Sequence, residues 1–117
     1  MHKYLDFDNS GTHTTHTTRT TNNADAFTNL GNWLRQNKRQ ATSTKTDGGA
    51  TDSSCLKAVC EQLDVLNNYS DVYLGWTGWS AGMFSGSYEL TEVPTNNGNS
   101  WTDVPLVTLC IAGKFKR

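Results

Sequence analysis

Charged residues are scarce in this sequence, and neither sign is in excess: Asp, Glu, Lys and Arg make up 18% of the chain, and the formal net charge is -1. Proteins that bind the nucleic-acid backbone normally carry a basic patch, which is missing here. The sequence also lacks an apolar run of the roughly 20 residues needed to cross a bilayer. We therefore expect one compact unit, or part of one, with no nucleic-acid partner and no membrane partner.

The amino terminus lacks the charged-then-apolar pattern of a secretory signal peptide. However, Thr, Asn, Ser and Gly are used heavily, which suits an extracellular protein with long polar loops. The triplet Asn68-Tyr69-Ser70 also fits the N-glycosylation pattern. We expect a secreted protein whose signal peptide lies outside this chain.

The chain has three cysteines, Cys55, Cys60 and Cys110, so the thiols cannot all pair within it. Cys55 and Cys60 are five residues apart and would point to different faces of a helix. Cys60 lies on the predicted buried face of a helix and Cys110 lies in a short apolar segment. This arrangement predicts a Cys60–Cys110 disulfide with Cys55 outside it. The alternative is three reduced cysteines in a cytosolic protein.

Hydrophobic spacing and turn residues predict an alternation of strands and helices. Strands are predicted over residues 1–5, 40–46 and 71–79. Helices are predicted over residues 24–37, 53–68 and 101–111. This order is typical of parallel βαβ units, with long loops after the strands. It fits the edge of a doubly wound sheet and also three-eighths of a barrel, and spacing alone does not choose between them.

Local patterns predict the helix ends and part of the core. Asn23 is expected to cap the first helix, and Ser100 with Asp103 forms the capping-box pattern expected to open the last one. Residues 80–98 are predicted to form a long loop. Trp33 and Trp101 fall in helical patterns, so both are expected to pack in the core.

Residue identities along nearly the whole chain carry a family resemblance. The stretches concerned are, in order, Met1-His2-Lys3-Tyr4-Leu5-Asp6, Asp8-Asn9-Ser10-Gly11-Thr12-His13, Trp33-Leu34-Arg35-Gln36-Asn37, Ser70-Asp71-Val72-Tyr73-Leu74-Gly75, Gly78-Trp79, Leu90-Thr91-Glu92 and Gly98-Asn99-Ser100-Trp101-Thr102-Asp103. Together they resemble the carboxyl-terminal part of fungal endo-β-1,4-glucanases of glycoside hydrolase family 5. The resemblance implies an α/β fold, namely a partial (β/α)8 TIM barrel made of the last three strand–helix units. Residues 1–117 would form one piece of a single catalytic domain whose amino-terminal half is missing.

The same resemblance implies a chemistry. Family members cut internal β-1,4 bonds of cellulose with retention, using one glutamate as acid/base and another as nucleophile. The acid/base belongs to an earlier strand that this chain does not contain. The nucleophile position falls at Lys45, because Arg39-Gln40-Ala41 and Thr44-Lys45-Thr46 match the family's Arg-Gln-Ala and Thr-Glu-Thr. An ammonium group there opposes the positive charge that develops on the sugar ring.

The resemblance therefore implies an endoglucanase by descent whose isolated chain does not hydrolyse cellulose. The alternative is a catalytically dead remnant that binds carbohydrate weakly. His2 and Tyr4 match the family's pair that lies beside the nucleophile, and Trp79 matches its sugar platform. Trp76 stands where the family usually has another aromatic residue, which either binds sugar or packs in the barrel.

The resemblance implies no cofactor and no metal, and β-1,4-glucan is the expected partner. His13 and His16 have a spacing that suggests a metal site, but no cysteine or carboxylate stands at a matching distance. Asp47, Asp52, Asp6 and Asp8 are possible substitutes for the lost carboxylate. Only Asp47 is close, and it lies too far along the strand for the roughly 5 Å separation of a retaining pair.

Two further departures from the family pattern lie near Lys45 or bear on the cysteine count. Arg19 stands where the family has the cysteine that would pair with Cys55. Thr42 and Ser43 place hydroxyl groups in a predicted central strand, where parallel sheets normally have apolar residues. Two explanations stay open: a decayed or truncated gene, and a partial sequence of a working gene that contains errors.

Overall fold

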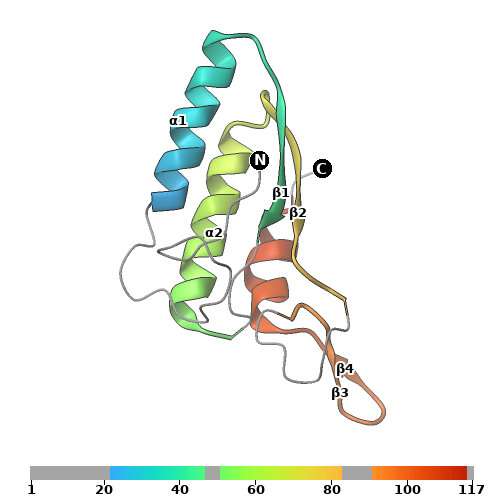
Figure 1. The fold of residues 1–117 in the computed structure, drawn as a ribbon. Helices are drawn as coiled ribbons and strands as arrows, with labels where there is room; N and C mark the ends of the chain where they lie inside the picture. Colours follow the sequence, from blue (N-terminus) through green and yellow to red (C-terminus); the bar gives the residue numbers. More distant parts are fainter. Residues whose placement is uncertain (1–21, 47–50, 83–90, 116–117) are drawn as a thin grey trace.

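The computed structural model describes residues 22–46, 51–82 and 91–115. In it, two helices pack together on one face of a small parallel sheet (Figure 1). The helices are α1 (Asn22–Gln36) and α2 (Ser53–Asn68), and the strands are β1 (Ala41–Thr46) and β2 (Tyr73–Gly78). The predicted strand over residues 1–5 lies outside the described residues.

A hairpin and a last helical segment complete the described structure. The hairpin strands are β3 (Thr95–Asn96) and β4 (Trp101–Thr102). The helical segment is a π-helix, η1 (Leu106–Ile111), which continues into α3 (Ala112–Lys114). Figure 1 shows the hairpin projecting away from the sheet and helices.

The predicted helices 24–37 and 53–68 are confirmed by α1 and α2, and α1 begins two residues earlier than expected. The apolar spacing is realised as burial, since Phe27 and Leu63 are fully buried and Leu34 is nearly so. Asp52 explains why α2 begins where it does. Its carboxylate accepts hydrogen bonds from the backbone N–H groups of Ser54 and Cys55, at 3.0 and 3.2 Å.

The predicted parallel βαβ unit is confirmed, because β1 and β2 pair in parallel and α2 connects them. Strand β1 has the predicted position, and β2 is shorter than the predicted 71–79. The register joins Ser43 to Trp76 and Thr46 to Gly78, so β1 has one residue more than β2 between these pairs. That extra residue is a β-bulge near the end of β1.

The core lies between the helices and the sheet. Tyr73 extends from β2 into this core, where its ring packs edge-on against Phe27 at a centroid distance of 5.9 Å. The Tyr73 hydroxyl donates a hydrogen bond of 2.8 Å to the Phe27 carbonyl oxygen, so the buried polar group is satisfied. Burial raises the pKa of Tyr73 to about 12, which keeps the phenol neutral.

The predicted helix over 101–111 is wrong in its first half, because residues 101–102 belong to the hairpin. Ser100 and Asp103 do not open a helix, because Asn97 and Gly98 form the turn of a hairpin instead. Gly98 has φ +87°, a conformation that suits glycine, and the Asn97 N–H donates to the Ser100 carbonyl at 2.9 Å. The helical segment begins only after Pro105, whose missing N–H is tolerated in a first helical turn. Strand β3 also interrupts the predicted loop over 80–98.

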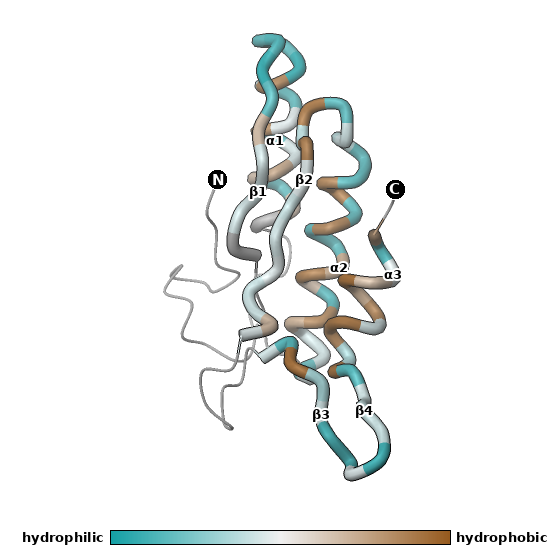
Figure 2. The backbone as a smooth tube through the Cα atoms, turned by 90° about the vertical axis from the view of Figure 1, so that its right-hand side faces the viewer, coloured by the Kyte–Doolittle hydropathy of each residue, from teal (hydrophilic) through white to brown (hydrophobic). Residues whose placement is uncertain are grey.

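The prediction that Trp33 and Trp101 lie in the core is also wrong. Trp33 is 52% exposed on α1, and Trp101 is 68% exposed on β4. Trp33 falls on the outer side of the amphipathic helix, whereas Trp101 belongs to a strand of the hairpin. Figure 2 shows that the hairpin is largely hydrophilic, while apolar residues follow α2 and the last helical segment. None of the helices in the described ranges is both long and apolar enough to cross a membrane.

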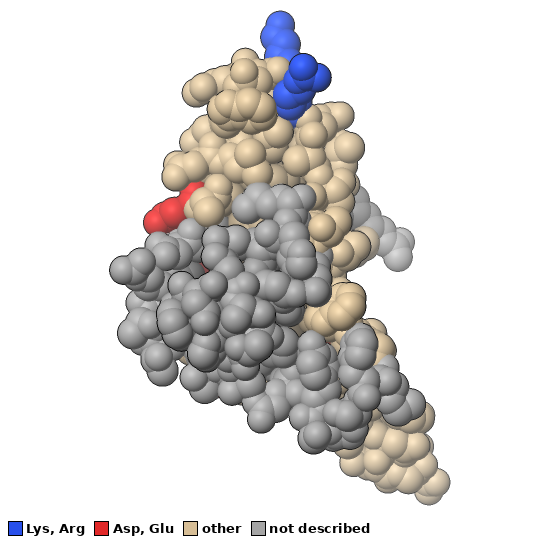
Figure 3. All heavy atoms as spheres, in the orientation of Figure 1, with Lys and Arg blue, Asp and Glu red and all other residues tan. Residues whose placement is uncertain are grey.

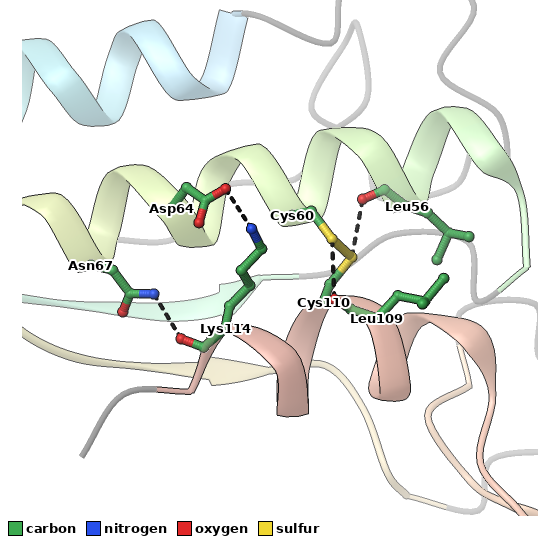
Figure 4. Close-up of polar contacts among 7 residues, drawn as sticks. All are labelled: Leu56, Cys60, Asp64, Asn67, Leu109, Cys110 and Lys114. Carbon is green, nitrogen blue, oxygen red and sulfur yellow. Dashed lines mark hydrogen bonds and ion pairs between the residues drawn. A yellow bond between two sulfur atoms is a disulfide. The ribbon is translucent and has the colours of Figure 1, made fainter.

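The predicted Cys60–Cys110 disulfide is confirmed, and it joins α2 to η1 across 50 residues of sequence (Figure 4). Two further contacts fasten the same pair of segments. Lys114 forms an ion pair of 2.7 Å with Asp64, and the Lys114 carbonyl accepts a hydrogen bond from the Asn67 side chain. Cys55 is fully buried and takes no part in the disulfide.

Candidate functional site

The candidate site lies at the edge of the sheet where β1 and β2 both end. Because the strands are parallel, their carboxyl ends meet at the same edge. Thr46 is the register partner of Gly78, Lys45 precedes Thr46, and Trp79 follows Gly78. Neighbouring strands lie about 4.8 Å apart, so the backbone positions of Lys45 and Trp79 are close. The structure thus brings together two predicted site positions that are 34 residues apart in sequence.

The bulge in β1 falls at this same place. Ala41 and Ser43 alternate toward the helices, where Ala41 is partly buried and Ser43 is 1% exposed. The extra residue lies between Ser43 and Thr46 and interrupts the regular alternation of faces at Lys45. Bulges are frequent beside active sites because they change the direction of a strand locally. The side chain of Lys45 lies outside the described residues.

Trp79 and Ser80 continue from β2 into the loop at this edge. Trp79 is partly buried, and the peptide bond that joins it to Ser80 is cis. Ser80 is 8% exposed, and its carbonyl accepts a hydrogen bond of 2.9 Å from the Glu92 N–H. This backbone bond ties residue 92 to the segment that carries the predicted sugar platform.

Trp76 lies in a different environment from Trp79. It is partly buried and packs against the core. It also lines a groove of about 480 Å³ with residues of α2 and of the last helical segment, including Leu66 and Ile111. These contacts favour the interpretation of Trp76 as a packing residue over that of a sugar-binding residue.

Glu92 is a residue at this edge whose place the sequence did not reveal. Its carboxylate lies against Gly78, where an added Cβ would meet Oε1 at 2.6 Å. The buried Oε1 has no hydrogen-bond partner among the described residues, and burial raises the pKa of Glu92. Residue 92 falls in a stretch without periodic pattern, so only folding brings this carboxyl to the end of β2.

Of the other predicted site residues, only Asp52 falls within the described ranges. His2, Tyr4, His13, His16 and Asp47 lie outside the described residues. Asp52 caps α2, and the Ser54 side chain and the backbone hydrogen bonds lower its pKa. Its carboxylate therefore has a structural role at a helix amino terminus.

A basic groove of about 550 Å³ lies at the opposite edge of the sheet, where the strands begin. Its lining includes Arg35, Lys38 and Arg39, and Figure 3 shows Lys and Arg side chains at this end of the molecule. Arg35 is already engaged: it forms two hydrogen bonds of 2.8 and 2.6 Å with Asp71 and lies over the Tyr69 ring at 4.0 Å. This pairing lowers the pKa of Asp71. The groove joins α1 to the start of β2 and is separate from the candidate site.

Comparison with known proteins identifies a family. The model of the family described as cellulase, glycosyl hydrolase family 5, matches residues 1–82. The chain is 56% identical over 115 residues to endoglucanase EG-II of Hypocrea jecorina, which covers 97% of this chain and 27% of that protein. It is 40% identical over 96 residues to endoglucanase 1 of Saitozyma flava, covering 82% of this chain and 27% of the relative. The chain thus spans about a quarter of the length of these relatives.

Solved structures agree with this comparison. The crystal structure of Cel5A (EG2) from Hypocrea jecorina is similar with a TM-score of 0.81 at 56% identity, over 93% of this chain and 32% of that one. XacCel5A, solved in complex with cellopentaose, has a TM-score of 0.77 at 30% identity, over 92% of this chain and 34% of that one. Both similarities extend over nearly all of this chain, so the mixed helix-and-strand architecture is that of the family.

Proposed function

From the premise that this chain belongs to the glycosyl hydrolase family 5 cellulases, we propose that it is the carboxyl-terminal part of an endo-β-1,4-glucanase barrel and that by itself it binds β-1,4-glucan without cleaving it. The proposal is supported by one observation: the register pairs Thr46 with Gly78 where the two parallel strands end, and these residues are the chain neighbours of Lys45 and Trp79. Ligands of such sheets bind beyond the carboxyl ends of the strands. A full barrel of this kind needs roughly 250 residues.

Glucan binding is supported by the residue types at this edge. The indole of Trp79 offers an apolar face for the C–H groups of a glucose ring, with a polar N–H at its rim. The similar structure solved with cellopentaose supports the same class of ligand. The partner proposed for this chain is accordingly a β-1,4-linked glucan.

The absence of cleavage follows from the chemistry of residue 45. A retaining glycosidase needs a carboxylate that attacks the anomeric carbon and a second carboxyl about 5 Å away that protonates the leaving oxygen. An amine in the nucleophile's place cannot form the glycosyl ester, and its positive charge opposes an oxocarbenium-like transition state. Lysine nucleophiles serve carbonyl chemistry through Schiff bases, and an acetal offers no such carbonyl.

A titration of the purified chain with cellooligosaccharides, followed by tryptophan fluorescence and by chromatography of the sugars, tests this function. We expect a saturable fluorescence change with no shorter products above a blank. Trp79→Ala should remove the change, whereas Trp33→Ala, on the exposed face of α1, should retain it. Turnover by the unchanged chain would contradict the assignment of Lys45, and the absence of any saturable change would contradict glucan binding.

We further propose that the protein is secreted. The disulfide between Cys60 and Cys110 supports this, because disulfides persist in oxidising compartments. Treating cultures of the source cells with a thiol-blocking reagent before lysis would test it. If the protein is secreted, we expect to find it in the culture medium with the Cys60–Cys110 disulfide already formed.

A second candidate function is that the chain docks the remaining strands of a barrel. Leu74 on β2 is 65% exposed and Phe115 is 64% exposed, and both line the groove of about 480 Å³. Within the described part of the chain, β2 has a strand partner on one side only, so its other edge offers unpaired backbone groups. Size-exclusion chromatography with light scattering should show self-association that Leu74→Lys reduces. A clean monomer at all concentrations would count against this candidate.

A further inference from the structure

Among the described residues, Trp101 is the most exposed large apolar side chain, at 68%, and yet it belongs to an ordered hairpin. Exposing an aromatic ring to water is unfavourable, and rings of this kind are a common means of contacting a partner. Within the described residues, the Trp101 indole is thus accessible for contact with a partner.

The hairpin that carries Trp101 is fixed by its own hydrogen bonds. The Asn97 side chain donates to the Thr102 hydroxyl at 3.1 Å, and the Gly98 N–H donates to the Asn96 side-chain oxygen at 2.8 Å. The Asn97 backbone N–H donates to Ser100 at 2.9 Å. The ring is thus presented on a short scaffold that is already ordered, which lowers the entropic cost of binding.

The surroundings of Trp101 are polar. Asn96 lies directly opposite Trp101 in the antiparallel register, so the two side chains share one face of the hairpin. The neighbouring hairpin residues that are exposed are Thr95, Asn97, Asn99, Ser100 and Thr102. A ring surrounded by amides and hydroxyl groups suits a carbohydrate, which has apolar C–H faces and a polar rim. A protein-docking face would instead be expected to continue as apolar surface, as the Leu74–Phe115 groove does.

The position of the hairpin relates it to the glucan site. Figures 1 and 2 both show β3 and β4 projecting beyond the edge at which β1 and β2 end. That is the edge that carries Lys45 and Trp79. The hairpin lies downstream of Trp79 in the chain and extends the same end of the molecule.

We propose that Trp101, with Asn96 beside it, forms a second platform for the same β-1,4-glucan chain, remote from Trp79. This inference rests on the proposed function of the carboxyl edge. The hairpin platform contacts only glucans that are long enough to reach past the first platform. Its contribution to binding consequently depends on the length of the ligand.

Calorimetric titration with cellobiose and cellohexaose tests the inference, using the chain and its Trp101→Ala, Trp79→Ala and Trp33→Ala variants. Trp101→Ala should weaken cellohexaose binding about five-fold, as expected for the loss of one stacking contact, and should leave cellobiose binding unchanged. Trp79→Ala should weaken binding of both sugars. Trp33→Ala is the matched control, because Trp33 is also an exposed tryptophan but lies on α1, away from the hairpin.

Each outcome of the titrations supports or excludes the hairpin platform or the Trp79 site. If Trp101→Ala binds cellohexaose normally while Trp79→Ala does not, the hairpin platform is wrong and the proposed function stands. If only Trp101→Ala weakens binding, the glucan binds at the hairpin alone, which overturns both the Trp79 site and the role of the hairpin as a second platform. Failure of the unchanged chain to bind either sugar overturns both. A change of oligomeric mass in Trp101→Ala without a change in sugar affinity makes the hairpin a protein contact and overturns the inference.

Discussion

Ser43 places a hydroxyl group between β1 and the helices, where it is 1% exposed and its Oγ has no hydrogen-bond partner among the described residues. A buried polar group in this state costs about 1–3 kcal/mol. Ser43→Ala is therefore expected to raise the free energy of unfolding by about 1 kcal/mol.

Urea denaturation followed by circular dichroism measures this change. Ser54→Ala is the matched control, because the Ser54 hydroxyl donates a hydrogen bond to the Asp52 carboxylate at the start of α2. The same substitution should thus lower stability there. If Ser43→Ala is also destabilising, the Ser43 hydroxyl has a partner and does not weaken the strand.

Glu92 predicts a dependence of stability on pH. Burial raises its pKa above the value in the unfolded chain, so the folded state favours the protonated carboxyl. Its contribution to stability is fully present below the usual pKa of glutamate and is lost as pH rises through the raised pKa. Glu92→Gln cannot ionise, so we expect it to melt at a higher temperature than the unchanged chain near pH 7.

Thermal melting of both proteins over a pH series checks this expectation. Near pH 3 the two melting temperatures should converge, because Glu92 is then protonated in both states of the unchanged chain. Asp52 and Asp71, whose pKa values are lowered, are common to both proteins and cancel in the comparison. A Glu92→Gln variant that is less stable near pH 7 would show that the carboxylate is paired with a cation.

At the level of single residues, the sequence located the candidate site only in part. The family resemblance predicted Lys45 and Trp79 as members of one site, and their shared role stays a prediction. Glu92 was missed because a long-range contact with Gly78, and no local pattern, determines its environment. Trp101 was misplaced because its spacing matched a helix that the chain does not form there.

Among the elements, α1 depends on a glycine at its contact with α2. A Cβ added at Gly31 would meet the Tyr69 ring at 2.5 Å. That ring is held in place, since Arg35 lies over it at 4.0 Å and its hydroxyl donates to the Asn32 side chain at 2.8 Å. Gly31→Ala should thus cost about 1–3 kcal/mol of stability through overpacking, although alanine is favoured by about 1 kcal/mol in an open helix.

Gly113→Ala in α3 is the control, because it makes the same substitution at a helical glycine that has no close neighbour. An added Cβ there meets the Thr108 carbonyl oxygen at 3.5 Å, an ordinary contact. Chemical denaturation should place Gly113→Ala at or above the stability of the unchanged chain. If Gly31→Ala is equally well tolerated, α1 and α2 are not packed as described.

The disulfide that attaches η1 to α2 is expected to contribute strongly to the stability of the fold. The Cys60–Cys110 disulfide closes a loop of sequence separation 50, and the chain-entropy model assigns such a loop about 4 kcal/mol. We expect the Cys60→Ala/Cys110→Ala variant to lose about that much stability, which a denaturation curve measures. Lys114→Met removes only the partly exposed ion pair with Asp64 and should cost much less.

Helices with a strong hydrophobic period could be predicted from the sequence. Elements whose bounds depend on turns could not. Helix α2 was predicted with its observed bounds from its apolar spacing alone, and the structure adds the Asp52 cap at its start. The last helix was predicted five residues too early, since Ser100 and Asp103 match a capping box, whereas the chain turns at Asn97-Gly98 and becomes helical only after Pro105. The bulge in β1 was not predictable, because it depends on pairing with a strand 27 residues further along the chain.

For the whole molecule, the described structure leaves apolar surface at the side of β2. Leu74 and Phe115 are 65% and 64% exposed and line the same groove. A chain that spans 27% of the length of its relatives is expected to expose surface that a longer chain covers. The carboxyl edge with Lys45 and Trp79 is a separate surface, so glucan binding and barrel completion can be tested independently.

The most direct test of the account is a chemical-shift titration of the isotope-labelled chain with cellopentaose. The account predicts that the signals of Lys45, Gly78 and Trp79 shift together and saturate at one ligand concentration. The signals of Arg35 and Lys38, at the opposite edge of the sheet, should stay in place. Saturable shifts confined to that basic groove, or no saturable shift at all, would contradict the claim that residue 45 lies in a glucan-binding site.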